Sequence, residues 1–209
     1  MNSKIVIALA ASAAVVVAGC AAMQGPTDPA LEAKAVEMMK VSFKEKGQAK
    51  LDRLNQDETQ AQCSIYTGRE LPKDVAEKIE RVNMATIKWP ADGKLVGDWK
   101  QGEKIAQEGR GFQYSDDPKG PSGANCYACH QLTRQEISYG TIGPSLYNFG
   151  KIRGFNDETR RYAWGKISNS QAYNACSNMP RFGHNGVLTE QQIRDVVALL
   201  VDPASPVNQ

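Results

Sequence analysis

The 209-residue sequence has little net charge and no dense run of basic residues. Its 25 Lys and Arg are nearly balanced by 23 Asp and Glu, which leaves a formal net charge of +2. Phosphate binding needs a concentrated Lys/Arg surface, so this balance argues against nucleic acid as the main partner. A hydrophobic share of 41% argues against intrinsic disorder.

The sequence also lacks internal repeats and any convincing alternation of polar and apolar residues. Without that alternation there is no case for β-strands, whereas helical spacing of apolar residues recurs along the chain. Five cysteines are too few for a small disulfide scaffold. The predicted fold class is all-α.

Only the N-terminus carries a long hydrophobic run. Residues 5–18 follow Lys4 and are apolar apart from Ser12, and polar sequence begins soon after Cys20. A membrane-spanning helix needs about 20 apolar residues, so we predict a secretory signal peptide over residues 1–19. A buried N-terminal core helix is the less favoured reading.

The stretch Val17-Ala18-Gly19-Cys20 resembles a bacterial lipobox. Acylation of Cys20 would tether a periplasmic protein to a membrane surface without inserting it. Ordinary cleavage near Ala22 would instead remove Cys20. In both cases Cys20 takes no part in the thiol chemistry of the folded domain.

The mature chain is predicted to consist of a helical extension, residues 20–97, and a second helical domain, residues 98–209. In the extension we expect an amphipathic helix from Pro29 to Gly47, a polar helix from Leu51 to near Cys63, and a helix that starts near Pro72. The turn-forming residues 89–93 mark the boundary.

The second domain is predicted to contain three helices and a long loop. We expect helices from Asp98 to Gly109 and over residues 157–173, a loop over residues 112–125, and a last helix that begins at a capping box of Thr189 and Gln192 and ends at Pro203.

The segment Cys126-Tyr127-Ala128-Cys129-His130 has the C-x-x-C-H spacing of c-type haem attachment. Two thiols at this spacing can reach the two vinyl groups on one porphyrin, and the adjacent histidine can point a ring nitrogen at the iron. The sequence therefore predicts one covalently bound haem c.

Three other readings of this segment compete. A thioredoxin-like redox pair would need a βαβ context, which is missing. A structural zinc site would need a second ligand pair, but only Cys63, Cys176 and His184 remain, each singly placed. A disulfide between Cys126 and Cys129 would leave His130 without a role.

The second axial ligand is predicted to be Met179, which lies in Asn178-Met179-Pro180 between two helices. Bis-His ligation would have to use His184, and the other mature-chain methionines, Met23, Met38, Met39 and Met84, lie in the extension. Met179 could also be a gap-filler in the core. His–Met ligation raises the reduction potential and fills both axial positions, which favours electron transfer.

Cys63 and Cys176 are the two remaining thiols. In an oxidising compartment we favour a disulfide, which would pin the extension to the loop that carries Met179. Alternatively, Cys176 is a redox-active or iron-ligating thiolate, or both thiols are free.

Several stretches around the haem motif are similar to SoxX, the family of monohaem cytochrome c subunits of the bacterial sulfur-oxidation system. The resemblance covers roughly residues 98–202. It rests on residues 120–125 before the haem motif, the Gly140 to Leu146 stretch G-T-I-G-P-S-L after it, Asn178-Met179-Pro180, and the Leu188 to Leu200 ending L-T-E-Q-Q-I-R-D-V-V-A-L-L.

The resemblance implies a class I cytochrome c fold and a heterodimer with a SoxA-type cytochrome that bears the reactive cysteine. Such a complex, an L-cysteine S-thiosulfotransferase, joins thiosulfate to a cysteine of a SoxYZ-type carrier and passes electrons to a downstream cytochrome. This chain would supply no catalytic residue. In cytochromes c generally, the carbonyl at the position of Pro144 accepts the other ring N–H of the axial histidine, here His130.

Two further functions compete with this interpretation. A freestanding periplasmic electron carrier would be monomeric and independent of sulfur compounds. A haem sensor or peroxidase would need an open or labile axial position, which a Met179 ligand argues against.

Overall fold

The computed structural model describes residues 28–209, and within this range every named secondary-structure element is a helix. The predicted signal peptide and Cys20 lie outside the described residues. The chain divides after Lys44 into two compact units, residues 1–44 and 45–209. The second unit includes residues 45–97, whereas the sequence analysis placed the boundary at 97/98.

Helix α2 (Pro29–Ser42) belongs to the first unit. The Asp28 side chain accepts a hydrogen bond from the Ala30 N–H and caps the helix, and Pro29 fits the first turn, where no N–H is needed. The helix ends before the predicted Gly47, and none of its residues is buried. Its apolar side chains therefore form no core of their own.

The second predicted helix is two elements. A 3-10 turn, η1 (Leu51–Leu54), is followed by α3 (Glu58–Ile65). The break occurs because Asp57 starts a new helix: its carboxylate accepts from the Gln60 N–H while the Gln60 side chain accepts from the Asp57 N–H. After Pro72, α4 runs over Lys73–Met84 as expected.

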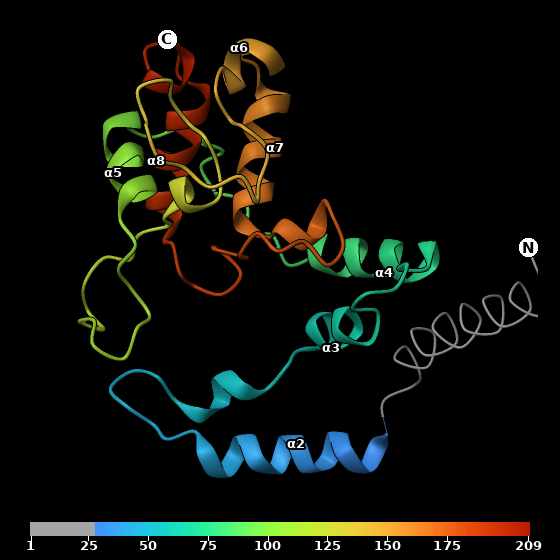
Figure 1. The fold of residues 1–209 in the computed structure, drawn as a ribbon. Helices are drawn as coiled ribbons and strands as arrows, with labels where there is room; N and C mark the ends of the chain where they lie inside the picture. Colours follow the sequence, from blue (N-terminus) through green and yellow to red (C-terminus); the bar gives the residue numbers. More distant parts are fainter. Residues whose placement is uncertain (1–27) are drawn as a thin grey trace, which may run out of the picture. The chain divides into compact units, whose positions relative to one another are not determined.

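Helices α5 (Trp99–Gln107) and α8 (Glu190–Val201) lie side by side in the second unit (Figure 1). The predicted capping box of Thr189 and Gln192 is confirmed at the start of α8. The two helices approach so closely at Gly102 that an added Cβ would lie 2.0 Å from the carbonyl oxygen of Asp195. The Asp195 carboxylate also accepts a hydrogen bond from the Asp98 N–H at 2.9 Å, which fixes the start of α5.

The remaining elements complete the second unit: α6 (Phe149–Arg153), α7 (Asp157–Ser168), η3 (Ser170–Ala172) and η4 (Pro206–Asn208). Helix α6 was not predicted, and the predicted 157–173 helix is interrupted at Asn169. The core is centred on side chains that are almost fully buried, including Leu132, Trp164, Val197 and Leu199.

Residues 45–97 join this core through both apolar and polar contacts. Ile87 belongs to the core cluster, and the Trp164 indole N–H donates to the Lys88 carbonyl at 3.1 Å. Asn83 of α4 is buried and bonds Asn169 at 2.9 Å. Residues 45–97 of the extension are thus part of the packed second unit. Between residues 28 and 209 there is no helix long and apolar enough to cross a membrane.

The Gly102→Ala substitution should reveal how tight the α5–α8 contact is. Alanine is the better helix former, but its Cβ would meet the α8 backbone, so we expect the free energy of unfolding to fall by about 1–3 kcal/mol. Urea unfolding of the haem-loaded protein measures this change. The neighbouring Gln101→Ala, which is exposed, should stay within about 0.5 kcal/mol of wild type; equal effects of the two would contradict the steric argument.

Candidate haem site

The haem-attachment segment is a tight turn. Asn125 adopts the left-handed conformation at φ 45°, which asparagine tolerates better than most residues, and η2 (Cys126–Ala128) follows. The backbone N–H groups of Cys129 and His130 both donate to the Cys126 carbonyl, at 3.1 and 2.9 Å. Tyr127 is buried and anchors the turn in the core. Both cysteines and the histidine are thereby held on one short piece of backbone.

A second segment, residues 140–146, runs alongside this turn. The N–H groups of Gly140 and Gly143 donate to the carbonyls of Tyr127 and Cys129, both at 2.8 Å, and Leu146 continues the pairing to Gln131. The approach is close, because a Cβ at Gly140 would lie 1.8 Å from the Ala128 carbonyl oxygen. The G-T-I-G-P-S-L stretch is therefore the backbone support of the haem-attachment turn.

This support also orients the histidine. Nδ1 of His130 lies 2.7 Å from the carbonyl oxygen of Pro144, the contact expected from the sequence. A carbonyl oxygen can only accept, so Nδ1 carries the proton and Nε2 keeps its lone pair for a metal. A Cβ at Gly143 would lie 2.2 Å from Cε1 of His130, so only glycine leaves room for the ring.

The thiols of Cys126 and Cys129 are unpaired in this structure. Burial raises the pKa of Cys126 to about 12, so its free thiol would be protonated at neutral pH. A redox-active C-x-x-C pair needs a thiolate with a lowered pKa. The site thus favours cofactor attachment over thioredoxin-like chemistry.

Met179 lies in the loop between η3 and α8, half-buried and packed against the core. Its carbonyl accepts a hydrogen bond from the Ser170 hydroxyl, and its N–H donates to Ser177 Oγ at 3.2 Å. Gln171 in turn donates to the Ser177 carbonyl at 3.0 Å. Sequence analysis missed these polar neighbours, because nothing in their spacing separates them from ordinary loop residues.

The other ligand candidates have different surroundings. His184 is exposed, and its Nδ1 lies 3.2 Å from the Thr86 hydroxyl of the extension. Cys176 is joined to Cys63 by a disulfide, the pairing favoured from the sequence, so it carries no free thiolate. Met84 lies in α4, and Met38 and Met39 lie in α2.

The residues present fit covalent haem c. Two thiols three residues apart are unpaired, the His130 ring is oriented with Nε2 available, and Gly143 leaves room for that ring. Cys126 and Cys129 would hold the group through thioether bonds, and His130 and Met179 would ligate its iron. Once bound, it accepts and releases one electron at a time.

Comparison with known proteins agrees with this chemistry. Residues 102–202 match the cytochrome c family. The chain contains a cytochrome c domain over these residues. It binds haem c, has the all-helical fold of a class I cytochrome c, and transfers electrons. Over 218 aligned positions, which cover all of both chains, it is 37% identical to an uncharacterized lipoprotein of Aquifex aeolicus (strain VF5).

Replacement of the proposed axial methionine should remove the weak absorption near 700 nm that marks Met–Fe(III) ligation. We expect wild type to show this band and Met179→Ala to lose it, because alanine offers the iron no sulfur. Visible spectra of the oxidised proteins provide the measurement. The control is Met84→Ala, which replaces a methionine in α4 of the extension. This variant should keep the band. A band that survives in Met179→Ala would assign the ligand elsewhere.

His184 should titrate as a free imidazole. Burial lowers its pKa below 6.5; the positive charges of Arg181 and Lys88 lower it further, and Asp57 opposes them. A folded pKa below the unfolded one means that His184 stabilises the fold above pH 6.5 and that this contribution is lost as the pH falls towards the folded pKa. NMR titration of the reduced protein measures the shift. An imidazole that does not titrate would place His184 on the iron.

Proposed function

We propose that this cytochrome c is the electron-transfer subunit of a SoxAX-like complex, which couples thiosulfate oxidatively to a cysteine of a SoxYZ-type carrier. The observation that best supports this proposal is that residues 140–146 resemble SoxX in sequence. In this structure the same stretch supports the haem-attachment turn and accepts the His130 hydrogen bond. The resemblance thus falls on the residues that build the haem site.

The thiols of the described residues support this division of labour. Cys126 and Cys129 are taken by the haem, and Cys63 and Cys176 are joined to each other. Within residues 28–209 no cysteine is left to form a bond with a sulfur substrate. The reactive cysteine is therefore assigned to a SoxA-type partner, with this chain as the electron exit.

The proposed reaction balances as a two-electron oxidation. A carrier thiolate, R–S⁻, and thiosulfate, S₂O₃²⁻, give the adduct R–S–S–SO₃⁻ and two electrons. One S–S bond forms and none breaks. The electrons leave singly, because a single haem takes only one at a time, and they pass to a downstream acceptor cytochrome.

The same proposal gives the protein a periplasmic location with a lipid anchor at Cys20. The lipobox-like sequence before Cys20 supports this, as does the name of the Aquifex aeolicus relative, which is that of a lipoprotein. Anchoring would keep the electron exit near membrane-bound acceptors.

Purification of the native protein under mild conditions tests the proposal. We expect it to co-purify with a second cytochrome, and we expect thiosulfate to reduce the haem of this complex only when a SoxYZ-type carrier is added. A carrier variant without its acceptor cysteine is the control and should give no reduction. A monomer that thiosulfate leaves oxidised under all these conditions would favour the freestanding electron carrier instead.

A further inference from the structure

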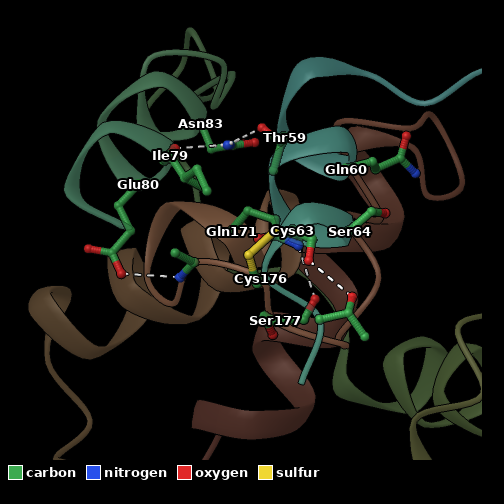
Figure 2. Close-up of a disulfide and its surroundings, with 12 residues drawn as sticks. Thr59, Gln60, Cys63, Ser64, Ile79, Glu80, Asn83, Gln171, Cys176 and Ser177 are labelled. Atoms are coloured by element: carbon green, nitrogen blue, oxygen red, sulfur yellow. Dashed lines mark hydrogen bonds between the residues drawn. A yellow bond between two sulfur atoms is a disulfide. The ribbon is translucent and has the colours of Figure 1, made fainter. Parts of the chain in front are cut away.

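Helix α3 is bonded to residues 176–181, here called the Met179 segment, on both sides of the methionine. Cys176, which precedes Met179, forms the disulfide with Cys63 of α3 (Figure 2). Arg181, which follows Met179, forms an ion pair with Asp57, the N-cap residue of α3. One helix of the extension therefore holds the segment before and after the proposed iron ligand.

The ion pair is buried on the arginine side only. The Arg181 side chain is 8% exposed, and its partner Asp57 is 42% exposed. Burial acts to raise the pKa of Asp57, but the Gln60 N–H and the Arg181 guanidinium outweigh it and leave the pKa below its usual value. A buried guanidinium that lost this carboxylate would be left unpaired, which is costly.

Helix α4 reinforces the same segment (Figure 2). The Glu80 carboxylate accepts a hydrogen bond from the Ala175 N–H at 3.1 Å. Asn83 accepts from Asn169 and donates to Thr59 of α3, both at 2.9 Å. Helices α3 and α4 are thus bonded to each other as well as to the chain around the Met179 segment.

Cys176 itself adopts a backbone conformation that needs support from its surroundings. Cys176 has φ 59°, in the left-handed region that a residue with a side chain rarely adopts. Such a conformation persists only where the surroundings impose it. Here the covalent bond to Cys63 holds the residue in place.

We propose that α3 is a clamp that keeps Met179 on the haem iron, with Cys63, Cys176, Asp57 and Arg181 as its positioning residues. The clamp resists outward movement of the 176–181 segment, so it opposes exchange of the methionine for other ligands and keeps the site alike in both oxidation states. This inference rests on Met179 ligation and electron transfer, and it does not depend on the sulfur chemistry.

Competition by exogenous imidazole tests the clamp, because imidazole binds the oxidised iron only after Met179 leaves. The first variant is Asp57→Asn: asparagine still caps α3 but cannot pair with Arg181 as an anion. We expect the band near 700 nm to remain without imidazole, and the imidazole concentration that half-removes it to fall about tenfold. An unchanged midpoint would overturn the role of the ion pair.

Asp92→Asn is the matched control. It breaks the Asp92–Arg194 ion pair, in which the aspartate is 45% exposed, close to the 42% of Asp57. This pair joins α8 to residues outside the Met179 segment, so its loss should leave the imidazole midpoint at the wild-type value. An equal shift in both variants would show a general loss of stability and overturn the clamp.

The double variant Cys63→Ser/Cys176→Ser tests the covalent tie. Variants are preferred to thiol reductants here, because reductants also reduce the iron. We expect a drop in the midpoint at least as large as that of Asp57→Asn. If the double variant does not fold, Asp57→Asn decides the proposal alone. A wild-type midpoint in both variants would overturn it.

The outcomes separate this inference from the proposed function. A wild-type band with lowered midpoints in the variants supports the clamp even when thiosulfate gives no reduction. Unchanged midpoints overturn the clamp and leave the sulfur-oxidation proposal intact. A wild-type protein without the band overturns the clamp, because Met179 would not be the ligand.

Discussion

His130 donates a hydrogen bond from Nδ1 to the carbonyl oxygen of Pro144, and this 2.7 Å contact determines which ring nitrogen faces a metal. The Pro144 carbonyl is in place because its neighbours, Gly143 and Leu146, are bonded to the backbone of the haem-attachment turn. A side chain at position 143 would displace the ring. The haem-attachment turn, the orientation of the His130 ring and the basicity of its metal-facing nitrogen therefore all depend on residues 140–146 and their backbone hydrogen bonds to the turn.

The segment around Met179, the proposed second ligand, is held by different physical means. Met179 lies in a loop without regular structure, and its backbone bonds only the hydroxyls of Ser170 and Ser177. The extension supplies the remaining order through a disulfide, an ion pair and the Asn83–Asn169 hydrogen bond. A cytochrome that must keep its iron coordination during electron transfer gains from this second layer, because reorganisation costs are smaller in a preorganised site.

How far the sequence predicts the structure depends on how local the signal is. The start of α8 follows from Thr189 and Gln192 alone, because a capping box is satisfied within four residues. The prediction of one polar helix from Leu51 to Cys63 was wrong for a similarly local reason. Asp57 and Gln60 form a capping box that begins α3, and the prediction did not take this capping box into account. Helix α6 carries no side-chain cap, so no comparable signal was present.

The contacts between the extension and the core could not be predicted from the sequence. In α4 the residue buried beside Ile79 is Asn83, and its partner Asn169 is far away in the sequence. Polar residues of this kind are expected on the surface, so their burial depends on partners that only the folded chain supplies. The boundary at 97/98 was placed by turn residues, whereas contacts such as Trp164 to Lys88 join the extension to the core.

The sequence by itself determined the chemistry: the spacing of Cys126, Cys129 and His130 specifies haem attachment, because the three groups act within one turn of backbone. It also limited the second ligand to a few residues. The tertiary structure decided what supports those groups. The pairing of residues 140–146 with the turn, and the two ties from α3 to the Met179 segment, join residues distant in the chain, and such contacts exist only once the chain has packed.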